Sequence, residues 1–369
     1  MSTPSADTLR SLRWWSARLW MALVLAALAG CAAPRHQNAY PVPEDTGVRV
    51  PPSYFLHRAW VQITRNLART EVPPVVALDL PALAERAFAV SWLGHSSLLV
   101  RAGAQWVLID PVFSGTAGPV QGLGPARLTA LPLSPDALPR IDVVLITHDH
   151  YDHLDLATVR RLAAQPGGAP TFLVGQGLGA WFAEAVQAPA QEFAWWQSTR
   201  IGTTGFTFVP AQHNSGRTLW SRNQTLWGGW VVEHAGRRFY HAGDTAYVAP
   251  LFADLRTRIG PIDLAALPIG AYLPREAMRF EHTDPDDAVQ AFQALGARRA
   301  FGIHWGTFQL GDDEPFQPAR DLATAVQRRG ATAFGLTAIG SVLDVAPTRD
   351  TAPTALRPPA ALVPAFARP

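Results

Sequence analysis

Residues 143–155 read Val-Val-Leu-Ile-Thr-His-Asp-His-Tyr-Asp-His-Leu-Asp, and this stretch decides the fold. The apolar run 143–146 predicts a buried strand, and the polar residues after it predict a loop at the carboxyl end of that strand. Three histidines and one aspartate fall close together in this loop: His148, His150, Asp152 and His153. Imidazole nitrogens and carboxylate oxygens are the ligands of zinc and similar divalent ions. Because side chains at such short spacing cannot all face one ion, the stretch predicts two adjacent metal ions.

Composition indicates a globular protein with a large core. The chain has 369 residues, 48% of them apolar and 10% aromatic, which suits one large domain or two moderate ones. The net charge is +2, but the first 30 residues hold three of the 31 basic residues and one of the 29 acidic ones, which leaves 28 of each. Lysine is absent and the arginines form no cluster. A nucleic-acid partner is therefore disfavoured.

The only cysteine, Cys31, excludes an intramolecular disulfide and a thiolate metal site. It follows the apolar run 19–30, which is too short to span a bilayer comfortably and matches the core of a secretory signal. The ending Leu28-Ala29-Gly30-Cys31 resembles the bacterial lipoprotein signal. That resemblance implies lipidation of Cys31 and anchoring in the cell envelope, and Ala32 after the cysteine favours the outer membrane, facing the periplasm. A short membrane anchor with an incidental cysteine is the alternative.

The chain divides by composition into four parts. Residues 1–30 form the expected signal peptide, and residues 31–84 are a proline-rich tether and extension with one helical segment at 54–70. Residues 85–345 form the expected folded domain, and residues 346–369 an alanine- and proline-rich tail. Within the domain, the glycine- and proline-rich segment 114–140 is too long for an ordinary connection, which predicts a functional loop near the site.

Strands and helices are expected on both sides of the histidine stretch. The predicted strands are 88–93, 97–100, 106–109, 172–174, 205–210, 229–233, 238–241, 264–268, 300–303 and 333–336. The predicted helices are 156–164, 179–187, 286–295 and 319–329. Asp284 and Pro285 are a typical N-cap and first helical residue for the third of these.

Further candidate ligands follow three of these strands. His213 comes after 206–212, Asp244 after 239–243, and His304 after 301–303. Strand ends converge when sheets share an edge, so residues distant in sequence can build one site.

The ligand set resembles that of the metallo-β-lactamase fold superfamily, an α/β fold built as an αββα sandwich. The sequence motifs that flank these ligands resemble most closely the N-acyl-phosphatidylethanolamine-hydrolysing phospholipase D-like family. Those motifs are Trp92-Leu-Gly-His-Ser-Ser97, Thr147-His-Asp-His-Tyr-Asp-His-Leu-Asp155, Pro210-Ala-Gln-His213, Ala242-Gly-Asp-Thr245, Ile269-Gly-Ala-Tyr272, His282-Thr-Asp-Pro-Asp286 and Ile303-His-Trp-Gly-Thr-Phe308.

The resemblance implies two divalent ions, zinc by preference, and a role for each ligand. His148, His150 and His213 would hold the first ion, and Asp152, His153 and His304 the second. Asp244 would bridge them. The expected reaction is attack of a bridging hydroxide on the phosphorus of a phospholipid-like substrate. Asp152, Asp244 and His282 are the candidate catalytic residues, with His282 placing the phosphate or protonating the leaving alkoxide.

Other residues have candidate supporting roles. Asp110 could accept the free N–H of a ligand imidazole, and its alternative role is to cap a turn. His95 could face the site or pack. Tyr272 and His282 resemble residues that line the family's substrate channel, although Glu281 places a negative charge beside a presumed phosphate pocket. His234 and His241 are expected to be surface or strand-packing residues.

The central tryptophans, 195, 196, 220, 227 and 230, suit a lipid interface, but burial in the sandwich is the preferred interpretation.

Two other functions stay open. A lactonase or other hydrolase of small phosphorylated compounds would use the same centre, because paired metals also polarise carbonyl groups. A non-catalytic lipoprotein of the envelope would show lost ligands, whereas all seven are present.

Overall fold

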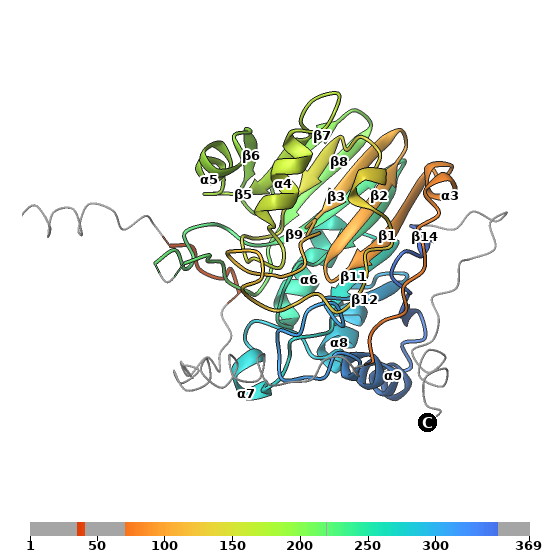
Figure 1. Ribbon diagram of the computed structural model, residues 1–369. Coiled ribbons are helices and arrows are strands. Elements are labelled where there is room, and N and C mark those ends of the chain that lie inside the picture. Colours follow the sequence, from red (N-terminus) through yellow and green to blue (C-terminus); the bar gives the residue numbers. More distant parts are fainter. Residues whose placement is uncertain (1–34, 41–70, 219, 346–369) are drawn as a thin grey trace, which may run out of the picture. The chain divides into compact units, whose positions relative to one another are not determined.

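The computed structural model describes residues 35–40, 71–218 and 220–345 (Figure 1). The chain divides into two compact units, Met1–His36 and Gln37–Pro369. Cys31, the expected signal and tail, and the expected helix at 54–70 lie outside the described residues. Among the helices that are described, none has the length and apolar character to cross a membrane. Because both sheets lie inside the second unit, a chain that lacks residues 1–31 keeps every contact that builds them.

The first sheet has seven strands and contains the histidine stretch. Its order is β14 (Val342–Asp344), β1 (Phe88–Gly94), β2 (Ser97–Ala102), β3 (Gln105–Ile109), β4 (Val143–Leu145), β5 (Thr171–Gly175) and β6 (Ala190–Phe193). The strands from β14 to β3 pair antiparallel, and those from β3 to β6 pair parallel. The parallel pairing of β3 with β4 places the residues after both strands at one edge.

The second sheet repeats this plan. Its order is β13 (Phe334–Gly335), β12 (Ala300–Ile303), β11 (Leu264–Pro268), β10 (Arg237–His241), β9 (Gly229–His234), β8 (Thr204–Val209) and β7 (Ser198–Ile201). The strands from β10 to β13 are parallel, and those from β7 to β10 are antiparallel. The loops after β10, β11 and β12 therefore meet at one edge.

The two sheets pack face to face with helices outside. One core cluster joins Trp92 and Val100 of the first sheet to Phe208 and Trp230 of the second. The first sheet is covered on its outer face by α3 (Leu80–Ala84), α4 (Leu156–Ala163), α5 (Gly179–Trp181) and the π-helical turn Phe182–Val186. The second is covered by α6 (Ala249–Ile259), α8 (Pro285–Leu295) and α9 (Gln317–Arg329), and Figure 1 shows helices on both outer sides. The expected αββα sandwich is confirmed.

Several elements differ from the expectation. The predicted helix at 179–187 is three α-helical residues followed by the π-helical turn, which ends at Gln187 in a left-handed conformation. The N-cap of α8 is confirmed, since Asp284 accepts a hydrogen bond from the Asp287 N–H at 2.8 Å. The sequence patterns do not predict β6, β7, β14, α3, α6 or the short α7 (Arg275–Met278). β6, β7 and β14 are short edge strands, and α3 and α7 are helices of five and four residues, so their apolar periodicity is weak.

The segment 114–140 is ordered by local pairing. Single β-bridges join Thr116 to Ala126 and Val120 to Leu123, so residues 116–126 form a small hairpin. The 3-10 helix η2 (Pro135–Ala137) follows, capped by the Ser134 hydroxyl. At the base of the hairpin, Val112 and Ala117 pack on Phe308.

Candidate metal centre

The predicted ligands come together where strands of both sheets end. The histidine loop follows β4, and Asp110 follows the parallel neighbour β3. His213 follows β8, Asp244 follows β10 and His304 follows β12. All seven predicted metal ligands belong to compact groups whose ligand atoms lie within 4.8 Å of one another.

The first group consists of three imidazoles. His148 Nε2 lies 2.9 Å from His150 Nδ1, which lies 3.3 Å from His213 Nε2. His148 and His213 are buried, and His150 is half-buried. Three ring nitrogens that point at one another leave room for a cation between them, and they are the donors that zinc prefers.

The second group combines one carboxylate with two imidazoles. His304 Nε2 and His153 Nε2 each lie 3.3 Å from Asp152 Oδ2. Both rings are fully buried, whereas the Asp152 side chain keeps 14% of its exposure. Asp152 therefore lies on the solvent side of this group.

Asp244 joins the two groups. Its Oδ2 atom lies 3.0 Å from His304 Nε2 and 3.2 Å from His153 Nε2 in the second group. The same oxygen lies 3.7 Å from His213 Nε2 and 4.0 Å from His148 Nε2 in the first. This is the placement that a bridging carboxylate needs.

Asp110 and Thr147 fix the histidine loop. Asp110 Oδ2 lies 2.7 Å from His153 Nδ1 and accepts the Thr147 hydroxyl proton at 2.6 Å, while Asp110 Oδ1 accepts the Thr147 N–H at 2.8 Å. Its carboxylate thus holds the far nitrogen of His153 and leaves Nε2 for a metal. Asp110 has a positive φ of 43°, a strained conformation kept by these contacts.

His213 is held from two sides. Its Nδ1 lies 2.9 Å from the carbonyl oxygen of Glu281, which points Nε2 into the first group. Its backbone N–H donates to Asn38 Oδ1 at 3.1 Å, and this oxygen also accepts the Trp227 indole N–H at 3.0 Å. The described part of the N-terminal segment is thus in contact with a predicted ligand.

His95 lies beside the second group. Its Nε2 is 2.9 Å from Asp152 Oδ2, and its carbonyl oxygen accepts the backbone N–H of His304 at 2.9 Å. The indole N–H of Trp92 donates to that same carbonyl at 2.7 Å. His95 and His304 both have positive φ, 52° and 62°. The turn after β1 therefore positions one ligand through its side chain and another through its backbone.

The charges in this cluster balance one another. Burial works against ionised carboxylates, but His153 and other imidazoles hold the pKa values of Asp152 and Asp244 well below the ordinary range. Burial, followed by the neighbouring rings, lowers the pKa of His148. Burial opposes protonation of His153, yet Asp244 and Asp152 raise its pKa well above the usual value. A divalent ion would displace that proton and take over the balancing charge.

The chemistry of the donor set fits divalent metal ions. His153 Nε2 and Asp244 Oδ1 are among twelve buried side-chain atoms of the described residues that have no hydrogen-bond partner, which is a costly arrangement for polar atoms. Nitrogen and carboxylate oxygen are the donors available, with no sulfur, which suits zinc and its neighbours in the first transition row.

The remaining predicted residues lie in two environments. His282 is buried next to the cluster, with Nδ1 unpartnered and 3.9 Å from Asp244 Oδ2. The Tyr272 hydroxyl donates to Asp321 of α9 instead, in a cavity of about 230 Å³. His241 is buried and lies 2.9 Å from the Ser96 carbonyl oxygen, and His234 packs edge-on against Phe88. The channel role of Tyr272 stays a prediction.

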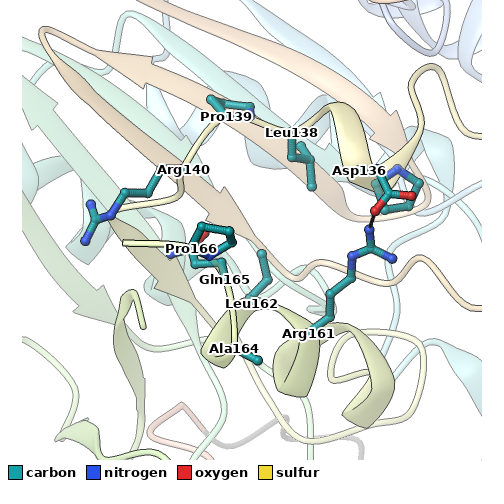
Figure 2. A pocket seen from close by; sticks show the side chains of 10 residues that line it. Asp136, Leu138, Pro139, Arg140, Arg161, Leu162, Ala164, Gln165 and Pro166 are labelled. Atoms are coloured by element: carbon teal, nitrogen blue, oxygen red, sulfur yellow. Dashed lines mark hydrogen bonds and ion pairs between the residues drawn. The ribbon is translucent and has the colours of Figure 1, made fainter. Parts of the chain in front are cut away.

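A larger cavity lies away from this centre. It has a volume of about 620 Å³ and is lined by residues of η2 and the far end of α4, as Figure 2 shows. Its two arginines already have partners, since Arg161 pairs with Asp136 and Arg140 lies 2.8 Å from Asp142 Oδ1. We assign no function to it.

Residues 105–305 match the family model described as the beta-lactamase superfamily domain, which covers more than half of the chain. The chain belongs to the beta-lactamase superfamily. Within it, an N-acyl-phosphatidylethanolamine-hydrolyzing phospholipase D from Caenorhabditis elegans is 36% identical over 278 residues, covering 71% of this chain and 77% of the relative. This chain is thus a homologue of that phospholipase.

Two further proteins are similar to this chain. A metal-dependent hydrolase from Nitratidesulfovibrio vulgaris is 32% identical over 236 residues, which cover 60% of this chain and 81% of that protein. A metallo hydrolase from Ignicoccus hospitalis superposes with a TM-score of 0.52 at 19% identity, covering 69% of this chain and 97% of that structure, and this likeness shows the fold alone. The protein is a metal-dependent hydrolase of the metallo-β-lactamase fold.

Sequence patterns did not single out every residue that supports the centre. Asn38 lies in the proline-rich tether, and Glu281 contributes through its backbone carbonyl, which no pattern of side chains reveals. Arg217 donates to the carbonyl oxygens of Asp149 and Leu154 at 2.7 and 2.8 Å and so holds both ends of the histidine loop. An isolated arginine in a loop gives no signal of such a role.

Proposed function

We propose that the protein is a dinuclear, zinc-dependent phosphodiesterase of phospholipase D type that acts on N-acyl-phosphatidylethanolamine-like lipids. The observation that carries this proposal is the pair of ligand groups that share Asp244, in a homologue of enzymes that hydrolyse this lipid. Water would add to phosphorus, and the bond to the ethanolamine oxygen would break. The products are phosphatidic acid and an N-acylethanolamine, which takes the proton.

Two ions held by these groups would acidify a water molecule and stabilise charge on the phosphoryl oxygens. The chain supplies the rest. Asp110 and Glu281 O fix ring orientations, so the ligand nitrogens are positioned before substrate arrives. His95 holds one oxygen of Asp152. Burial of most ligands keeps bulk water away from the reacting atoms, which strengthens each electrostatic contact.

His282 is the candidate for contact with the phosphate. Burial, offset in part by Asp244, lowers its pKa to about 3, so the ring is neutral at pH 7. A neutral imidazole can donate one N–H to a phosphoryl oxygen. The Glu281 carboxylate lies 3.1 Å from the Arg222 guanidinium, and this pairing compensates its negative charge beside the phosphate.

We also propose that Cys31 carries a lipid anchor that holds the domain at the outer membrane, facing the periplasm. Support for this comes from the sequence: the arginine-bearing start, the apolar run 19–30 and the ending Leu28-Ala29-Gly30-Cys31. Mass spectrometry of the intact protein from a bacterial membrane fraction tests it. A diacylglyceryl-modified N-terminal Cys31 is the expected result, and an unmodified chain would contradict it.

Parallel assays test the enzymatic proposal. Protein that lacks residues 1–31 is loaded with zinc and assayed against N-acyl-phosphatidylethanolamine and a sugar-phosphate lactone, and products are identified by mass spectrometry. Phosphatidic acid and N-acylethanolamine in equal amounts are expected, absent with Asp152→Ala/His153→Ala. Turnover of the lactone alone would show that the protein is a hydrolase but that the proposed lipid substrate is wrong. No turnover of either by metal-loaded protein would favour a non-catalytic envelope protein.

A further inference from the structure

Apolar side chains project into solvent from two loops around the metal centre. Among the described residues, the three most exposed large apolar side chains are Trp220 at 78%, Val120 at 62% and Leu123 at 61%. Of the other central tryptophans, Trp227 and Trp230 are buried, and Trp195 and Trp196 are half-buried. Exposing these three side chains to water costs free energy that the fold does not recover.

The first loop is the hairpin 116–126, with Val120 and Leu123 paired at its tip. Its base is attached to the centre. Arg127 donates to the Val112 carbonyl oxygen and lies 4.8 Å above the Phe308 ring, which packs edge-on against His95 at 5.3 Å. The base of the hairpin is thus connected through Arg127 and Phe308 to His95, which contacts Asp152.

The second loop carries Trp220 and is attached to the histidine stretch. Gly216 N–H donates to Asp149 Oδ1 at 2.6 Å, and Arg217 binds the carbonyl oxygens of Asp149 and Leu154. On its other side, Arg222 pairs with Glu281, the neighbour of His282. Both apolar tips therefore belong to loops that are fixed to the metal centre.

We propose that Val120, Leu123 and Trp220 form an interfacial docking rim that inserts into the surface of a lipid bilayer. This inference rests on the proposed function, because a two-chain phospholipid resides in a bilayer and the centre must approach that surface. Tryptophan and branched aliphatic residues are the side chains that partition into the interfacial region. Such docking would place the ligand groups at the depth of the lipid headgroups.

The start of the described chain supports this orientation. Asn38, which binds the His213 backbone, follows Cys31 by seven residues, a reach of at most about 25 Å for an extended chain. An anchor at Cys31 would therefore hold the centre close to the bilayer. The rim would add a second, weaker contact, and two linked contacts bind more tightly than either alone.

The charges beside the rim indicate apolar insertion instead of attraction to anionic lipid. Arg222, next to Trp220, is already paired with Glu281, and Arg217 is used inside the protein. Salt screens contacts between exposed charges but leaves apolar burial intact. Binding to zwitterionic vesicles in both low and high salt is therefore expected.

Vesicle co-sedimentation tests the rim. Zinc-loaded protein without residues 1–31 is mixed with phosphatidylcholine vesicles, and the bound fraction is compared for wild type, Trp220→Ser and the double variant Val120→Ser/Leu123→Ser. Each change should weaken binding by roughly tenfold, the cost of losing one or two inserted apolar side chains. Val76→Ser is the matched control, because Val76 is also exposed, at 45%, but lies beside Ile339 outside both loops.

Activity measurements separate this inference from the proposed function. The rim variants should keep wild-type turnover of a water-soluble phosphodiester such as bis-p-nitrophenyl phosphate and lose turnover only of vesicle lipid. Wild-type-like vesicle binding by both rim variants, or an equal loss in Val76→Ser, would overturn the docking rim. Normal vesicle binding by wild type, lost in the rim variants, without any phosphodiester turnover would support the docking rim and contradict the proposed phosphodiesterase activity.

Discussion

The two halves of the metal centre are built in different ways. Four predicted ligands come from one loop after β4, between His148 and His153. The other three, His213, Asp244 and His304, arrive singly after β8, β10 and β12 of the second sheet. The first half is local in sequence and needs one loop conformation. The second half exists only when a whole sheet has formed and closed on the first, so the centre reports correct packing of the sandwich.

The halves meet in a narrow contact between backbones. Gly243, directly before Asp244, has a φ of +63°, and a Cβ atom there would lie 2.7 Å from the Gly228 carbonyl oxygen and 2.9 Å from Thr147 Cβ. Gly228 N–H donates to the Thr147 carbonyl oxygen at 3.0 Å. The Asp244 carboxylate is therefore positioned by a close approach that only glycine permits.

Removing ligands from the local half should have the largest effect. Asp152→Ala/His153→Ala should abolish turnover, with a loss of about 10³-fold or more, because the second ion and one side of Asp244 are lost together. Circular dichroism should show an intact fold. His304→Ala removes the same ion from the other half, so a much smaller loss in this variant would show that the halves are not equivalent partners. Retained full activity in the double variant would contradict the two-metal mechanism.

Disrupting the close contact between the two halves at Gly243 should have the second largest effect. Gly243→Ala should destabilise the protein by about 2–4 kcal/mol, since overlap with Thr147 and Gly228 adds to the strain of a positive φ. Chemical denaturation measures it. Gly236→Ala is the control, because Gly236 also has a positive φ, +73°, but its Cβ would meet nothing within 4 Å. Equal losses in the two variants would mean that the close approach is unimportant.

Loosening the support of the local half should have an intermediate effect. Asp110→Asn should weaken zinc binding by about 10–100-fold, roughly 1.4–2.8 kcal/mol, because the ring of His153 loses its charged partner. Competition with a chromophoric chelator gives the affinity. Asp263→Asn removes another buried carboxylate, one that accepts the Arg238 N–H away from the centre, and it should leave zinc affinity unchanged.

Loosening the support of the second half, which consists of His213, Asp244 and His304, should have the smallest effect. Asn38→Ala should weaken zinc binding several-fold, or by about 1 kcal/mol, because the His213 backbone N–H loses one hydrogen bond. Asn38→Asp keeps the acceptor and should restore the affinity. Tyr40→Phe, which removes a contact to Asp254 on α6, should not change it. No difference between Asn38→Ala and wild type would show that the segment 35–40 is independent of the centre.

The same contrast explains what the sequence could predict. The local half can be predicted from the sequence because four predicted ligands fall in six consecutive positions after an apolar strand, and the flanking sequence motifs resemble one family. His213, Asp244 and His304 were separately ambiguous and became candidates through that resemblance. The core strands and α8 carry strong apolar periodicity or a cap, so their presence was predicted with boundaries off by one or two residues.

What escaped prediction depends on three-dimensional contacts. β14 has three residues and gains its stability by pairing with β1, more than 250 positions earlier in the chain. Asn38 contacts the His213 backbone N–H through its side chain, and Glu281 contacts the His213 ring through its backbone carbonyl oxygen, so both contacts depend on the tertiary fold. The strained turns at His95, Asp110 and His304 are kept by hydrogen bonds from other elements. Local propensity carries no information on any of these.

The metal content of the purified protein tests the central claim most directly. Zinc-loaded wild type, freed of loose metal by gel filtration and measured by inductively coupled plasma mass spectrometry, should contain two ions per chain. Asp244→Ala, which removes the shared oxygen, should contain one or fewer. One ion per chain in the wild type, or two ions in Asp244→Ala, would contradict a centre whose two ligand groups share this carboxylate.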